Sequence, residues 1–130
     1  HGCMPFSIKA SNFLDLGFNS VGVGAIFSPF TCITSDIQIG KYFHCNLRSH
    51  ITHDCIIGDY VTFAPGVCCN GNVVIEDHAY IGAGAVIKQG LPSKPLVIGK
   101  GAVVGMGAVV TKDVAAGVVV AGNPAKPLVK

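Results

Sequence analysis

Residues 39–57, with the sequence IGKYFHCNLRSHITHDCII, carry an apolar residue at every sixth position. The same spacing continues in both directions along one unbroken frame. The frame residues are Val21, Phe27, Ile33, Ile39, Cys45, Ile51, Ile57, Phe63, Cys69, Ile75, Ile81 and Ile87. Self-similarity at a fixed short period indicates that the chain stacks repeated units into a solenoid.

The frame is interrupted once, near the C-terminal end of the chain. The spacing slips by five residues across residues 93–97, SKPLV, and resumes at Ile98, Val104 and Val110. Prolines break regular structure because they fix φ and lack a backbone N–H. We therefore expect a loop that leaves the solenoid at this point.

A period of six does not fit an α-helix, whose apolar stripe repeats every 3.6 residues, whereas glycines and β-branched residues favour short strands. Three hexads can form one triangular coil, and stacked coils pair through parallel strands. We predict an all-β fold, a parallel β-helix with about five coils: 21–38, 39–56, 57–74, 75–97 and 98–115. Residues 1–20 are expected to cap the first coil or to be the remnant of a further domain, and residues 116–130 to form an extended tail.

The composition excludes several classes of protein. Half of the 130 residues are hydrophobic and only 12% are charged, with a net charge of +2, so a nucleic-acid partner or an anionic membrane surface is not expected. No apolar run approaches the roughly 18 residues of a membrane span, and the first residues do not resemble a secretory signal. We therefore expect a cytoplasmic protein with one compact domain.

The six cysteines do not form a metal or disulfide pattern. Cys68 and Cys69 are adjacent, and no two cysteines have the Cys-x-x-Cys spacing of zinc fingers. Cytoplasmic thiols stay reduced and behave as small hydrophobic side chains. We therefore expect the cysteines to be free, several of them in the core.

The segment HDCIIGDY at residues 53–60 resembles a signature of the sugar acetyltransferases of the sialic acid O-acetyltransferase and bacillosamine-type N-acetyltransferase group. The resemblance continues through 64–66 and 71–73, and through the later segments IGAGAVI, GMGAVV and GNPAK, and it covers about residues 21–126. It implies a left-handed β-helix, acetyl-CoA as co-substrate, and a homotrimer with active sites between subunits.

The same resemblance assigns roles to individual residues. It implies that His53 is the general base and that Asp54 raises the basicity of His53. The coenzyme A arm is implied to contact Thr62, Ala83 and Met106, and Asn46 to help hold the acceptor sugar. Imidazole suits the role of base because it titrates near neutral pH and can take the proton that an attacking amine or hydroxyl loses.

Two features depart from the group's pattern. Relatives often place a second histidine, which contacts the thioester region, at the position of Thr62, so we expect weaker acetyl-CoA affinity here. Members of the group also begin with a nucleotide-binding α/β domain, whereas about twenty residues precede the repeat in this sequence.

Other basic and metal-ligating residues leave alternatives open. Lysines 100, 112, 126 and 130 can meet coenzyme A phosphates or simply form a solvated surface. A related β-helix family, the γ-class carbonic anhydrases, binds zinc through a His-x-x-x-x-His pair, a spacing that is absent here. We therefore expect no metal, and we interpret His44, His50 and His78 as surface residues.

The sequence thus supports two functional hypotheses. The first is an acetyltransferase that moves an acetyl group from acetyl-CoA to an amino or hydroxyl group of a nucleotide-linked sugar. The second is a non-catalytic trimeric β-helix module that serves as a scaffold. Release of free thiol from acetyl-CoA in the presence of amino sugars distinguishes the two.

Overall fold

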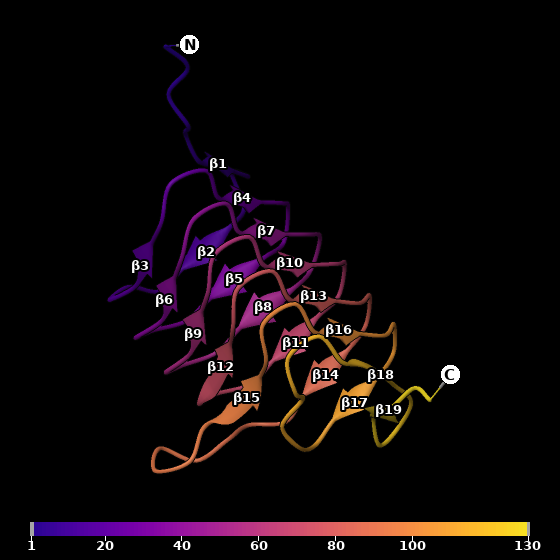
Figure 1. The fold of residues 1–130 in the computed structure, drawn as a ribbon. Helices are drawn as coiled ribbons and strands as arrows, with labels where there is room; N and C mark the ends of the chain where they lie inside the picture. Colours follow the sequence, from indigo (N-terminus) through magenta and orange to yellow (C-terminus); the bar gives the residue numbers. More distant parts are fainter. Residues whose placement is uncertain (1, 130) are drawn as a thin grey trace.

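The computed structural model describes residues 2–129, among which no helix occurs. Short strands joined by turns stack into a triangular prism whose two termini lie at opposite ends (Figure 1). The predicted all-β solenoid is therefore confirmed. Residues 1 and 130, which the predicted cap and tail include, lie outside the described residues.

Each of the first five coils contributes one strand to each of three sheets, which form the faces of the prism, and the later strands extend only two of these sheets. Sheet A contains β1 (Ile8–Lys9), β4 (Ile26–Phe27), β7 (His44–Cys45), β10 (Thr62–Phe63), β13 (Tyr80–Ile81), β16 (Val103–Val104), β18 (Val119–Ala121) and the antiparallel β19 (Lys126–Pro127). Sheet B contains β2 (Leu14–Asp15), β5 (Cys32–Ile33), β8 (His50–Ile51), β11 (Cys68–Cys69), β14 (Val86–Ile87) and β17 (Val109–Val110). Sheet C contains β3 (Ser20–Val21), β6 (Gln38–Ile39), β9 (Ile56–Ile57), β12 (Val73–Ile75) and β15 (Leu96–Ile98).

The strands pair in parallel with a register of three hexads. Thr62 lies opposite His44 in sheet A, and Cys68 lies opposite His50 in sheet B. We name the three edges by the sheets that they join: the AB edge, the BC edge and the CA edge. Residues eighteen apart in sequence therefore lie side by side along one edge, which is how distant residues come to share a site.

The frame residues point inward and form the core. From Phe27 to Val110 they are at most a few per cent exposed. The rings of Phe27, Phe43 and Phe63 pack edge to face along the axis of the prism, with centroids 5.9 and 5.1 Å apart. Among the cysteines, all free, burial raises the pKa of the Cys45 thiol to about 12. Three free cysteines, Cys45, Cys55 and Cys69, are thus buried in the core, as predicted.

The coil count differs from the prediction, because the solenoid has about six turns rather than five. Strands β1, β2 and β3 form an additional coil and pair with β4, β5 and β6. All of its residues except Val21 come from the segment that the sequence placed before the repeat. The frame positions of β1 and β2 hold Lys9 and Asp15, both exposed. Periodicity of apolar residues could not reveal this coil, because it packs against the core on one side only.

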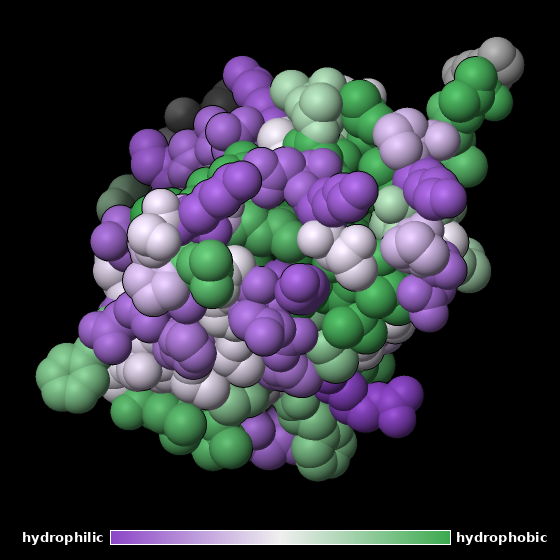
Figure 2. Space-filling model, turned by 90° about the horizontal axis from the view of Figure 1, so that it is seen from below, coloured by the Kyte–Doolittle hydropathy of each residue, from purple (hydrophilic) through white to green (hydrophobic). Residues whose placement is uncertain are grey.

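The other end of the prism is closed by the tail. Strand β19 pairs antiparallel with β18, and Ala125 packs against the core. Seen from below, a small recessed hydrophobic area near the middle is bordered by hydrophilic residues, and further hydrophobic residues lie at the rim (Figure 2). The tail thus covers part of an apolar end that would otherwise expose unpaired backbone.

Candidate active site

His53 lies on the BC edge, in the turn between β8 and β9. Its Nδ1 is 2.7 Å from Oδ2 of Asp54, and the two side chains are 56% and 55% exposed. Asp54 adopts a left-handed backbone conformation with φ of 57°, which aspartate tolerates better than most residues. The turn therefore brings adjacent residues into contact and leaves the imidazole open to a ligand.

Gly71 lies beside His53 in the next coil. A Cβ atom on Gly71 would fall 2.4 Å from Cε1 and 2.6 Å from Nε2 of His53. The imidazole thus lies over a bare Cα, in space that any other residue would fill. The two turns are also joined by a hydrogen bond of 3.1 Å from the Asn72 N–H to the His53 carbonyl.

The ion pair prepares His53 to accept a proton. When Nδ1 carries the ring proton it donates to the Asp54 carboxylate, and Nε2 then presents a free lone pair. The carboxylate also stabilises the imidazolium that forms when Nε2 takes up a proton. An exposed imidazole with this partner can act as a general base.

The residues expected to contact coenzyme A lie on other parts of the prism. Thr62 faces outward from β10 in sheet A, between His44 and Tyr80. Ala83 and Met106 lie on the AB edge in successive coils, where the Gly107 N–H donates to the Ala83 carbonyl at 2.7 Å. Within one chain, sheet B separates the AB edge from His53, so the structure does not bring the predicted residues together in a single protomer.

Asn46 also lies away from His53, at the start of the AB edge. Its side-chain Nδ2 donates to the Phe63 carbonyl at 2.8 Å, and the residue is half-buried. The amide thus holds two coils together. A role in holding the acceptor, which the resemblance implies, remains a prediction for this residue.

The sequence analysis missed two features of the BC edge. It did not assign a role to Gly71, although the eighteen-residue register places it beside His53. It also did not connect the loop at residues 88–96 with this edge, where Gly90 donates to the Gly71 carbonyl at 3.0 Å. A search for residues three hexads apart, that is eighteen residues, could have identified both Gly71 and the loop as neighbours on this edge.

Known proteins resemble this chain in architecture and in sequence. The family described as the hexapeptide repeat of succinyl-transferase matches residues 72–112. GDP-perosamine N-acetyltransferase of Escherichia coli O157:H7 is 59% identical over 128 residues, which are 98% of this chain and 58% of that protein. The structure of WeeI from Acinetobacter baumannii AYE is 65% identical, with a TM-score of 0.92, over 92% of this chain and 57% of that one.

A third relative carries a ligand. The acetyltransferase domain of PglB from Neisseria gonorrhoeae FA1090, in complex with acetyl coenzyme A, is 27% identical with a TM-score of 0.86, over 98% of this chain and 60% of that one. The chain carries hexapeptide repeats and has the left-handed β-helix fold of these proteins. The predicted resemblance to sugar acetyltransferases is thereby confirmed. This hexapeptide-repeat chain spans less than two thirds of the length of each of these relatives.

The other histidines within residues 2–129 of this hexapeptide-repeat protein lie on other strands and turns than His53. His78 stacks on Tyr60 at the CA edge, with ring centroids 5.0 Å apart, and His44 and His50 are half-buried on sheets A and B. Within residues 2–129, no three His, Cys, Asp or Glu side chains are grouped so that they could hold a metal ion. The same part of the chain contains no helix long and apolar enough to cross a membrane.

Proposed function

We propose that the protein transfers the acetyl group of acetyl-CoA to an amino group of a nucleotide-linked sugar, with His53 as the general base. The observation that carries this proposal is the exposed His53–Asp54 pair lying over Gly71. The 59% identity with a GDP-perosamine N-acetyltransferase supports an amine as the acceptor and acetyl-CoA as the donor. We also propose that the reaction takes place in the cytoplasm.

The proposed reaction is an attack of the amine nitrogen on the thioester carbonyl. Nε2 of His53 takes the proton that the nitrogen loses, and Asp54 stabilises the imidazolium. Collapse of the tetrahedral intermediate forms the amide bond, breaks the carbon–sulfur bond and releases the thiol of coenzyme A, which receives the proton. Holding the two reactants together on a rigid edge can supply a large part of the rate, up to roughly 7–11 kcal/mol of barrier.

The proposed site requires a second protomer, and the resemblance implies that the assembly is a homotrimer. Thr62, Ala83 and Met106 lie on the far side of sheet B from His53 in one protomer. A groove that uses all of them therefore needs the BC edge of one protomer to face sheet A and the AB edge of its neighbour. Met106 is 82% exposed, as expected for a residue that a ligand or a second chain would cover.

The proposal is tested by measuring the release of free thiol from acetyl-CoA in the presence of GDP-perosamine and a panel of nucleotide-linked amino sugars. We expect turnover by the wild type and a loss of about 10²–10⁴-fold in the variant His53→Asn. The matched control His78→Asn, at an equivalent turn of the CA edge, should retain wild-type activity. Equal background rates in wild type and His53→Asn would instead support the non-catalytic module.

A further inference from the structure

Cys55 is a buried thiol in the turn of the candidate base, and the proposed reaction does not use it. It follows His53 by two residues, and its side chain is fully buried. Its Sγ lies 3.3 Å from the carbonyl oxygen of Asn70 in the next coil and 3.6 Å from the carbonyl oxygen of His53. The thiol therefore connects the turn of His53 with the turn that carries Gly71.

The sulfur of Cys55 also accepts hydrogen bonds from the next coil. The backbone N–H of Val73, eighteen residues further along the chain, donates to it, as does the Cys69 thiol. The hydrogen bond with Cys69 lowers the pKa of the Cys55 thiol, burial opposes this effect, and the Val73 N–H lowers the pKa further. With Asn70 at its start and Val73 at its end, the turn of Gly71 is held at both ends by one side chain.

Ser49 makes the same pair of contacts on the AB edge. Its Oγ donates to the Ala64 carbonyl at 2.9 Å and accepts the Val67 N–H at 3.0 Å. These partners lie fifteen and eighteen residues ahead of Ser49, the same separations as for the partners of Cys55. The bridge between successive coils therefore recurs in the prism, and a hydroxyl can take the place of the thiol because both groups donate and accept.

An apolar side chain would fill the slot of Cys55 equally well. The same slot holds Ile37 one coil before and Val73 one coil after, and both side chains are buried. Neither side chain has a donor or an acceptor. Core packing, which is all that the sequence predicted for such cysteines, therefore does not require a thiol here, whereas the bridge requires a polar atom.

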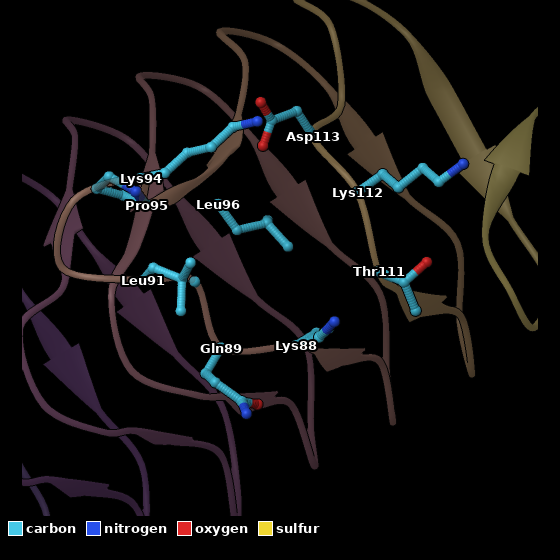
Figure 3. Close-up of a pocket in the computed structure, with 10 residues that line it drawn as sticks. Lys88, Gln89, Leu91, Lys94, Pro95, Leu96, Thr111, Lys112 and Asp113 are labelled. Carbon is cyan, nitrogen blue, oxygen red and sulfur yellow. The ribbon is translucent and has the colours of Figure 1, made fainter.

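The turn of Gly71 is held from its other side by the loop at residues 88–96. The Gly90 N–H donates to the Gly71 carbonyl at 3.0 Å, and the Leu96 N–H donates to the Asn72 carbonyl at 3.1 Å. Figure 3 shows this loop where it returns to the prism at Leu96. Held between the loop and the thiol bridge, the turn has little freedom to move away from the candidate base.

We propose that Cys55 is a positioning residue of the acetyl transfer: its thiol holds the turn of Gly71 against the turn of His53 and so keeps the imidazole in its place over the Gly71 Cα. The inference rests on the proposed function, in which Nε2 of His53 takes the proton of the amine. Cys55 itself does not touch the reactants, because its side chain is fully buried. It acts through the direction of the imidazole, and misplacement of a reacting group by about 1 Å can cost on the order of 10²-fold in rate.

The proposal is tested with variants that fill the same slot with and without a polar atom. Cys55→Ser keeps a donor and an acceptor, as in Ser49, whereas Cys55→Val and the smaller Cys55→Ala remove both. Nitrogen-15 NMR of the histidine-labelled chain at alkaline pH reports which ring nitrogen of His53 carries the proton, and it requires no substrate. We expect the Nδ1–H tautomer to predominate in the wild type and in Cys55→Ser. In the two apolar variants we expect a mixture of tautomers, because the contact with Asp54 loosens.

The rate of acetyl transfer gives a second readout. We expect kcat to fall about tenfold in Cys55→Val, with KM for acetyl-CoA unchanged, and Cys55→Ser to keep the wild-type kcat. The control Val61→Ala shortens a buried side chain of the CA edge. It should lower Tm but change neither the tautomer of His53 nor kcat.

Each outcome decides the role of Cys55. The same tautomer in the wild type and in both apolar variants, or equal kcat in Cys55→Val and Cys55→Ser, would overturn the proposal, because the side chain would then only fill the core. A change in Val61→Ala as large as in Cys55→Val would also overturn it, since the effect would follow from a general loss of stability. A wild-type chain that transfers no acetyl group would contradict only the proposed function, because the tautomer of His53 is measured without turnover.

Discussion

The BC and CA edges of the prism are built from the same repeat but differ in the side chains that they expose. On the CA edge, Tyr42, Tyr60 and His78 stack with ring centroids 5.2 and 5.0 Å apart. On the BC edge, His53 has Gly71 as its neighbour in the next coil and lies over its Cα. A histidine thus becomes part of an aromatic stack on one edge, whereas a single glycine leaves a histidine accessible on the other.

The carboxylates of the two edges differ in the same way. Oδ1 of Asp59 accepts the Lys41 N–H at 2.8 Å, and Oδ1 of Asp77 accepts the Asp59 N–H at 2.7 Å. Asp54 instead contacts the imidazole of His53. The CA edge therefore uses its acidic side chains to join coils, while the BC edge uses one to polarise a base. A solenoid can hold a reactive edge because its other edges carry the stabilising contacts.

The difference between the BC and CA edges is tested most directly by filling the space beside His53. In the variant Gly71→Ala, the new Cβ would displace the imidazole, and a shift of about 1 Å at a reacting group can cost on the order of 10²-fold in rate. We expect that loss in kcat/KM, measured by thiol release, with a small change in Tm because the side chain can swing outward. A wild-type rate in Gly71→Ala would show that the observed ring position does not matter.

A second variant separates the two uses of aspartate. Asp54→Asn removes the charge that stabilises the imidazolium and should lower kcat on the order of tenfold. Asp59→Asn keeps an oxygen that can accept the Lys41 N–H, so it should change neither kcat nor Tm. Measurements of kcat and Tm for both variants test these expectations. Equal effects of the two substitutions would contradict the proposed difference between the carboxylates of the two edges.

Removing a ring from the CA edge tests the stabilising role of that edge. Tyr60 lies between Tyr42 and His78 in the stack, and Tyr60→Ala should lower the free energy of unfolding by about 1–2 kcal/mol. Urea denaturation gives this value, and the acetyl-transfer rate at 25 °C should stay unchanged. A loss of activity without a loss of stability would place a ligand on the CA edge instead.

The smallest expected effect tests whether sheet A of a neighbour faces the BC edge. Thr62→His lengthens the reach of a hydrogen-bonding side chain on sheet A and should lower the Kd for acetyl-CoA by a few-fold. Calorimetry measures this change, with Tyr80→His, on the neighbouring strand β13, as the control. Identical affinity in Thr62→His and the wild type would contradict the predicted contact.

The fold was largely predictable because one physical constraint repeats along the chain. Each frame residue from Phe27 onward is buried, so the six-residue apolar period directly identifies residues of the core. The additional N-terminal coil was not predictable, since Lys9 and Asp15 occupy its frame positions and its strands are exposed. This coil is held by backbone pairing with the next coil rather than by burial of apolar side chains. Because every residue other than proline has the same backbone donor and acceptor, such pairing gives no pattern in the sequence.

By itself, the sequence determined the repeat and the inward side chains, because these depend on spacing and residue type along one hexad. Its resemblance to sugar acetyltransferases indicated the candidate base. The tertiary structure decided which distant residues share an edge. His53 meets Gly71, and the loop at residues 88–96 meets Lys112, only because three hexads close one coil and the next coil stacks in register. Coiling thus converts a separation along the chain into lateral contact, and the physical reason is the parallel pairing of strands from successive coils.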